Sequence, residues 1–224
     1  MFNELYWLLF AIINFSLILV MYRIFGRTGL FVWIGMSTVV ANIQVTKMVE
    51  LFGMTATLGN IIYGTAFLAT DILNEKYGKN DAKRAVWMGF FTLISMTIMM
   101  QLALQFIPAE SDVVQDALNT IFSQIPKVAI GSLLAYLVSQ YVDVLIYSAI
   151  KARLPQDKFL WVRNNGSTMV SQLLDTLVFT AIAFYGTPWD IWFEIFLTTY
   201  VIKFIVAAAD TPFLYVAKRF KHGK

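Results

Sequence analysis

The pattern Ser-Gln-x-x-Asp occurs twice in parts of the chain that are otherwise apolar. Its two copies are Ser139-Gln140-x-x-Asp143 and Ser171-Gln172-x-x-Asp175. Inserting an ionised carboxylate at the centre of a membrane helix costs roughly 2.5 to 3.5 kcal/mol. Such a residue is therefore typical of a functional site, and both carboxylates are candidates for binding a polar ligand.

Other polar residues interrupt the neighbouring apolar segments and extend the candidate site. Lys203 needs an acidic partner in hydrocarbon, which we expect to be Asp143, Asp175 or Asp210. A structural alternative applies to each residue, because amides can link helices by hydrogen bonds worth about 0.6 kcal/mol and charges can form a purely structural ion pair. The full set of candidate substrate-binding residues is Asp143, Asp175, Gln140, Gln172, Lys203, Asn42, Tyr200 and Asp71.

The composition indicates a membrane protein. Hydrophobic residues make up 58% of the 224 residues and charged residues only 14%, whereas soluble domains carry roughly 25% charged residues. No linker separates the apolar runs, so residues 1–224 are expected to form a single polytopic domain. The chain has no cysteine, and its one histidine is His222. These counts argue against disulfides, thiol nucleophiles and a His/Cys metal site, and we expect neither a cofactor nor enzymatic activity.

Apolar runs of about 20 residues, the length of helix that crosses about 30 Å of hydrocarbon, predict an all-α integral membrane protein. Residues 112–124 have amphipathic helical spacing and are predicted to form a short interfacial helix on the outer side. The predicted membrane-spanning helices cover residues 5–22, 28–50, 54–74, 85–107, 127–150, 167–186 and 190–217.

The basic residues predict the orientation of these helices. Most of the 17 Lys and Arg residues lie in the loops after the first, third, fifth and seventh predicted helices, and such loops face the cytoplasm by the positive-inside rule. The N-terminus is therefore predicted outside and the C-terminus inside. The opposite segment, residues 108–126, contains Glu110, Asp112 and Asp116 but no basic residue. The chain has no basic patch with interleaved aromatic residues, so the sequence does not indicate a nucleic-acid partner.

Antiparallel packing of the fifth and sixth helices would bring the two Ser-Gln-x-x-Asp copies to one depth. Asp143 and Asp175 each lie about eight residues from the inner boundary, or roughly 12 Å at about 1.5 Å per residue. Gln and Asp in each copy are three positions apart and share a helix face. We therefore expect Gln140 near Asp175 and Gln172 near Asp143.

Several of these residues belong to longer motifs. The third predicted helix ends in Phe67-Leu68-Ala69-Thr70-Asp71-Ile72-Leu73-Asn74-Glu75-x-Tyr77-Gly78. The accompanying motifs are Ala41-Asn42-x-Gln44-Val45-x-Lys47, Gln140-x-x-Asp143-Val144, Ser167-Thr168, Ser171, Asp175-Thr176 and Tyr200-x-x-Lys203. With these motifs in this order, the chain resembles the queuosine precursor transporter family, also called the vitamin uptake transporter family. The resemblance implies a six-helix transporter core, to which the first predicted helix is an addition.

The resemblance also implies import of queuosine precursors, the cyano- and aminomethyl-substituted deazaguanines, across the bacterial cytoplasmic membrane for tRNA modification. The expected partners are this nucleobase-like molecule and the lipid bilayer, with homo-oligomer formation left open. The residue types suit a guanine-like cargo. A carboxylate can accept hydrogen bonds from the adjacent ring N–H and amino group, and Gln amides can bind the remaining edge.

Two other functions fit parts of the pattern. A membrane subunit that binds substrate for an ATPase-driven vitamin or nucleobase importer would need a partner, because the chain has no P-loop. Two aspartates at one depth on consecutive helices also resemble the dyad of intramembrane aspartyl proteases, which shares a proton. The chain lacks the Gly-x-Gly-Asp and Pro-Ala-Leu motifs of those proteases, so we favour the importer.

Overall fold

A long bent helix, α1, opens the chain in the computed structural model, which describes residues 2–51, 54–123, 125–183, 185–186 and 188–220. α1 runs from Phe2 to Gln44, and Gly26 within it has φ 57° and ψ −137°. This backbone conformation lies outside the helical region and favours glycine, which has no Cβ. The bend divides α1 into two halves, which correspond to the predicted helices 5–22 and 28–50.

A β-hairpin follows α1 and contradicts the predicted bounds of two helices. Strands β1 (Met48–Leu51) and β2 (Met54–Thr57) pair antiparallel, and α2 begins only at Gly59. The predicted helix 28–50 was therefore too long at its end and the predicted helix 54–74 began too early. The chain is otherwise helical and consistent with the predicted all-α class of membrane protein. Hydropathy does not distinguish a short apolar strand from a helix end, and β-branched Val and Thr favour the strand.

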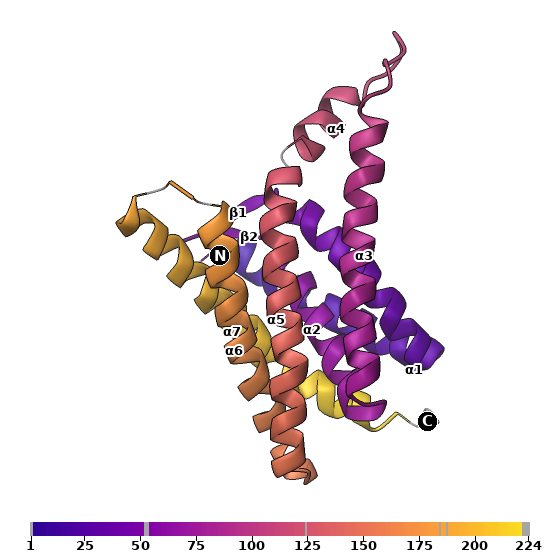
Figure 1. The fold of residues 1–224 in the computed structure, drawn as a ribbon, viewed down its shortest axis with the longest axis vertical. Coiled ribbons are helices and arrows are strands. Elements are labelled where there is room, and N and C mark those ends of the chain that lie inside the picture. The colour runs from indigo at the N-terminus through magenta and orange to yellow at the C-terminus, as the bar shows by residue number, and fades with distance from the viewer. Residues whose placement is uncertain (1, 52–53, 124, 184, 187, 221–224) are drawn as a thin grey trace.

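The remaining helices follow the predicted order (Figure 1). α6 starts before the predicted residue 167 because Arg163 and Asn164, which a hydropathy average assigns to a loop, are buried side chains in its first turns. The helices are α2 (Gly59–Lys76), α3 (Lys79–Ala103), α5 (Ile125–Arg153), α6 (Leu160–Ala183) and α7 (Trp189–Lys218), with a 3-10 turn at Asp157–Phe159.

The predicted interfacial helix is present as α4, Gln115–Phe122, at one end of the bundle between α3 and α5 (Figure 1). The Asp112 carboxylate accepts hydrogen bonds from the backbone N–H groups of Val114 at 2.7 Å and Gln115 at 3.2 Å. These bonds satisfy donors that have no partner within the helix. The helix is therefore confirmed, and its place on the outer membrane surface stays a prediction.

Four helical segments of the described chain are long and apolar enough to cross a membrane: Phe2–Gln44, Lys79–Ala103, Ala129–Arg153 and Trp192–Lys218. Large apolar side chains such as Leu9, Phe91 and Leu197 are exposed on them, as expected for surfaces that face lipid. α2 and α6 carry more polar residues, and most of these are buried. The chain thus has apolar residues outside and polar residues inside, which places the candidate site between the helices. The number of crossings and their orientation stay predictions.

Glu75 at the end of α2 holds α5, α6 and α7 together. Its carboxylate forms ion pairs with Lys151 of α5 at 3.3 Å, Arg163 of α6 at 3.0 Å and Lys218 of α7 at 2.9 Å. Arg163 is fully buried and also donates to the backbone carbonyls of the α5–α6 connection. Because Asp71 lies one turn before Glu75 on α2, this contact fixes Asp71 relative to the three helices.

Candidate functional site

α5 and α6 pack so that each copy of the Ser-Gln-x-x-Asp pattern contacts the other. Ser139 donates a hydrogen bond to Asp175, at 3.0 Å between Oγ and Oδ1, and Ser171 donates one to Asp143 at 2.9 Å. All four side chains are buried. The two copies therefore lie at one level of the bundle, as predicted. The hydrogen bonds between the two copies are made by the serines, and the expected proximity of each Gln to the opposite Asp stays a prediction.

Asp175 is held by donors on three helices. Tyr63 of α2 donates to its Oδ1 at 2.6 Å, and Lys203 of α7 forms an ion pair with its Oδ2. The Lys203 ammonium also lies 5.4 Å from the centre of the Tyr63 ring, within range of a cation–π contact. The predicted acidic partner of Lys203 is thus Asp175. With Ser139 as a further donor, both carboxylate oxygens are satisfied.

Asp143 belongs to a second acidic group, which we call the carboxyl cluster: Asp71 of α2, Asp143 of α5 and Asp210 of α7. All three residues have 0% exposure. Asp71 neighbours Asp143, and Asp210 is close enough for its charge to act on both. Asn164 donates to Asp210 at 2.5 Å. Among the described residues, no Lys or Arg forms an ion pair with any member of the cluster.

Several buried polar atoms without hydrogen-bond partners belong to the carboxyl cluster or to residues near it in the structure or along α5 and α6. Buried polar groups in folded proteins are paired in the great majority of cases, so these unpaired atoms make this part of the bundle a candidate site for a polar ligand. The atoms concerned are Asp71 Oδ1 and Oδ2, Asp143 Oδ2, Asp210 Oδ2, Gln140 Nε2, Gln172 Oε1, Asn164 Oδ1 and Thr168 Oγ1.

Gln140 and Gln172 lie three positions before Asp143 and Asp175 on α5 and α6, so each shares the helix face of its aspartate. Gln140 accepts a hydrogen bond from Thr70 of α2 at 3.2 Å through its carbonyl oxygen, which leaves its amide nitrogen without an acceptor. Gln172 has the opposite arrangement, since its carbonyl oxygen lacks a donor. One unsatisfied donor and one unsatisfied acceptor therefore accompany the free oxygen of Asp143.

Two of the predicted site residues make their described contacts with other parts of the chain. Asn42 donates to the backbone carbonyl of Thr38 in its own helix at 2.9 Å. Tyr200 donates to the backbone carbonyl of Met169 at 3.4 Å, and its ring stacks on Phe196. Neither residue has a described contact with the carboxyl cluster or with Asp175.

Neither Tyr63 nor Asp210 was among the predicted substrate-binding residues. A tyrosine among apolar residues is ordinarily explained by core packing. The helical spacing offered a signal, because Tyr63 and Thr70 are seven positions apart and share the face of α2 that meets α5. Asp210 lies seven positions after Lys203 on α7 and shares its face in the same way.

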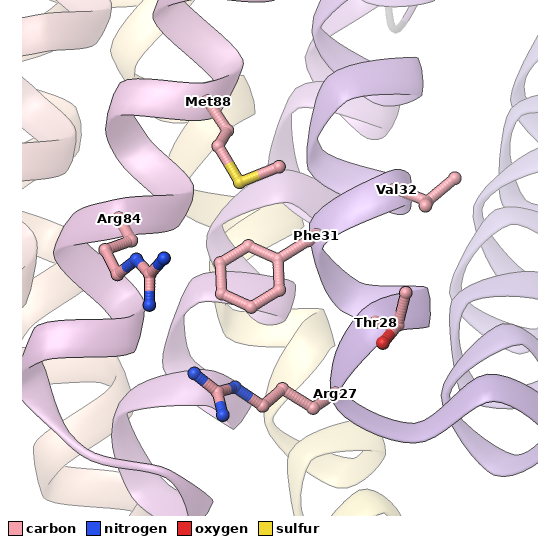
Figure 2. A pocket seen from close by; sticks show the side chains of 6 residues that line it. All are labelled: Arg27, Thr28, Phe31, Val32, Arg84 and Met88. Atoms are coloured by element: carbon pink, nitrogen blue, oxygen red, sulfur yellow. The ribbon is translucent and has the colours of Figure 1, made fainter.

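A surface hollow of about 350 Å³ lies between α1 and α3, away from these residues (Figure 2). The guanidinium groups of Arg27 and Arg84 line it together with the apolar side chains of Phe31, Val32 and Met88. Arg27 is paired with Asp81 at 2.5 Å. None of the predicted substrate-binding residues lines the hollow. Among the described residues, no group of three His, Cys, Asp or Glu side chains is arranged to hold a metal ion.

Comparison with known proteins identifies the family. The family model described as "Putative vitamin uptake transporter" matches residues 57–217. The chain is 57% identical over 220 residues to the "Probable queuosine precursor transporter" of Bacillus subtilis (strain 168), which covers 98% of this chain and 96% of the relative. It is 27% identical over 171 residues to the "Queuosine precursor transporter" of Escherichia coli (strain K12), which covers 75% and 74%. No solved structure gives a significant match.

The matched range, residues 57–217, runs from the start of α2 almost to the end of α7. It contains the carboxyl cluster, Asp175 and Lys203, and it leaves out α1 with Asn42. The family assignment also removes the aspartyl-protease alternative. The chain therefore belongs to the queuosine precursor transporter family, also described as vitamin uptake transporters, and it is a multi-pass membrane transporter and not an enzyme.

Proposed function

We propose that this chain imports queuosine precursors, the cyano- and aminomethyl-deazaguanines, across the bacterial cytoplasmic membrane for tRNA queuosine salvage. The names of the relatives from B. subtilis and E. coli support the cargo. The observation within the chain that supports it best is the set of three unsatisfied polar atoms at the α5–α6 contact: Gln140 Nε2, Asp143 Oδ2 and Gln172 Oε1.

These three atoms complement the edge of a guanine-like base. That edge presents a carbonyl oxygen, a ring N–H and an exocyclic amino group, in the order acceptor, donor, donor. Gln140 Nε2 offers a donor for the carbonyl, and the oxygens of Asp143 and Gln172 offer acceptors for the two N–H groups. A hydrogen bond to a carboxylate is charge-assisted and stronger than a neutral one. We therefore assign Asp143 as the main recognition residue.

The other candidate residues have supporting roles in this proposal. Asp175 has its charge matched by Lys203 and its oxygens satisfied by Ser139 and Tyr63, so it orders the α5–α6–α7 contact beside the cargo. Asp71 lies next to Asp143 and increases the negative charge there. A cationic aminomethyl group would be attracted by that charge. Asn42 and Tyr200 receive no role in contacting the cargo.

A test of the cargo uses a bacterium that can neither synthesise deazaguanines nor import them. When the chain is expressed and a precursor is supplied at low concentration, we expect queuosine to return to the tRNA. Purified chain in proteoliposomes should also take up radiolabelled precursor, and unlabelled precursor should compete while unmodified guanine competes less. Equal tRNA queuosine with an empty vector would reject this cargo.

The same proteoliposomes distinguish the alternative in which the chain is a substrate-binding subunit for an ATPase. Uptake by the purified chain alone, without ATP, supports an independent transporter. Binding of precursor without uptake, together with copurification of an ATPase from native membranes, would support the subunit.

We also propose that the N-terminus lies outside and the C-terminus inside, with a six-helix core preceded by one extra helix. The exposed residues Asn119 of α4, Asn80 of α3 and Gln156 after α5 allow a test, since the chain has no native cysteine. In intact cells, an impermeant maleimide should label Asn119→Cys but neither Asn80→Cys nor Gln156→Cys. All three should be labelled after the cells are opened. Labelling of position 80 or 156 in intact cells would reverse the orientation.

A further inference from the structure

The carboxyl cluster brings three acids together without a positive charge to match them. Asp71, Asp143 and Asp210 come from three different helices, and each is completely buried. An isolated buried carboxylate is strongly disfavoured, and two neighbouring carboxyls do not both ionise readily because like charges repel. The nearby cations are engaged elsewhere, since Lys203 pairs with Asp175 and Arg163 pairs with Glu75.

The cluster also has fewer hydrogen-bond donors than acceptors, although Asn164 donates to Asp210 and Ser171 donates to Asp143. Five buried acceptor atoms have no donor: both oxygens of Asp71, one each of Asp143 and Asp210, and the carbonyl oxygen of Asn164. Thr168 of α6, which has 1% exposure, faces Asp143 and has no other partner for its hydroxyl. A proton on a carboxyl converts an acceptor into an O–H donor. One proton therefore both lowers the negative charge of the cluster and supplies a missing hydrogen bond.

The surroundings of the cluster are otherwise neutral or already paired. Glu75 on α2 and Tyr147 on α5 face Asp71, and the charge of Glu75 is matched by Lys151, Arg163 and Lys218. The groups that α6 presents to the cluster are uncharged: Asn164, Ser167, Thr168 and Ser171.

We propose that the Asp71–Asp143–Asp210 cluster binds a proton that crosses the membrane together with the cargo, so that this transporter is a proton symporter. The identity of the cargo in this proposal rests on the proposed function. The proton enters from the outer side onto a carboxylate oxygen and leaves to the inner water, and no other bond is made or broken. With the proton bound, the loaded site carries less charge and can close around the cargo. Loss of the proton inside restores the carboxylate repulsion and favours reopening.

The test uses purified chain in proteoliposomes that contain a pH-sensitive dye, with the membrane potential clamped at zero by potassium and valinomycin. The cargo is the uncharged cyano-deazaguanine. Acidifying the outside by one pH unit should drive accumulation up to about tenfold, because one proton per cargo makes each pH unit worth a factor of about ten. The dye should report acidification of the interior that depends on cargo. Uptake that ignores the pH gradient would overturn the proposal.

Asp210→Asn and Asp71→Asn replace an acid with an amide of the same size, and Asp157→Asn is the matched control, because Asp157 lies in the α5–α6 connection with an 80% exposed side chain. The ratio of gradient-driven accumulation to cargo exchange should fall about tenfold in the first two variants and stay unchanged in the control. If both cluster variants accumulate cargo as the wild type does, the cluster does not couple transport to protons.

Infrared spectroscopy of the wild-type protein without cargo separates this proposal from the proposed function. A carbonyl band of a buried protonated carboxyl should be present near neutral pH, should disappear at high pH, and should be lost or shifted in Asp71→Asn but kept in Asp157→Asn. If deazaguanine is not transported but the band is present, the cargo is wrong and proton binding stands. If the band is absent at every pH at which the protein is folded, the proton site is wrong whatever the cargo.

Discussion

Replacing Asp143 with asparagine is expected to weaken precursor binding about tenfold or more while leaving the protein folded. The variant keeps the size of the side chain and one oxygen, which can still accept the hydrogen bond from Ser171. It places an N–H₂ group where the unsatisfied Oδ2 lies, so that a donor faces the N–H donors of the precursor. Leaving buried groups mismatched in this way costs about 1 to 3 kcal/mol.

The measurement is the Kd of the purified variant for labelled precursor at one fixed pH, together with uptake into proteoliposomes. Asp157→Asn is again the control. Its exposed ion pair with Lys218 contributes at most about 1 kcal/mol to stability, and Asp157 lies outside the site. Gln140→Leu offers a second arm, because it removes the donor proposed for the carbonyl of the precursor. Wild-type affinity in both Asp143→Asn and Gln140→Leu would place the cargo elsewhere.

The order of the helices and the apolar exterior were predictable because both follow from hydropathy. The bounds at the hairpin were not, because residues 45–57 are apolar enough to continue a helix by composition and local strand pairing decides the outcome. The predicted start of α6 was too late because polar residues near its beginning were assigned to a loop. Its first turns contain Arg163 and Asn164, and their burial depends on Glu75 and Asp210, which lie far away in sequence.

The contact between the two repeated patterns was predictable because equal depth on antiparallel helices follows from residue counting. Which side chains meet at this contact could not be predicted, because a small rotation of α5 or α6 exchanges serine for glutamine there. The carboxyl cluster combines residues from α2, α5 and α7, and no local spacing relates Asp71 to Asp210. Asp143 and Asp175, both predicted as substrate-binding residues, lie in two different environments, since Asp175 is matched by Lys203 and Asp143 has no cation among the described ion pairs.

The ion pair between Lys203 and Asp175 is expected to contribute more to stability than any exposed pair in the chain. Both residues are buried, with 7% and 3% exposure. Lys203→Met keeps most of the apolar stem but leaves the Asp175 carboxylate without a cation, and Asp175→Asn leaves the ammonium without an anion. Either change alone should destabilise the protein by about 3 to 5 kcal/mol, because it leaves one uncompensated buried charge.

The double variant Lys203→Met/Asp175→Asn should recover much of that loss, because neither charge remains. The four proteins form a double-mutant cycle that is measured by thermal unfolding in detergent. Because the double variant should lose less than either single variant, the coupling should be at least about 3 kcal/mol, the size of one single loss. The matched control is the cycle of Arg27→Met and Asp81→Asn, whose pair also joins two helices but has a 47% exposed arginine side chain, so its coupling should stay below about 1 kcal/mol. Additive losses in the Lys203/Asp175 cycle would show that the two charges are not partners. A double variant that is stable and binds precursor but does not transport it would have a different meaning. The two charges would then be needed for motion during transport and not for folding.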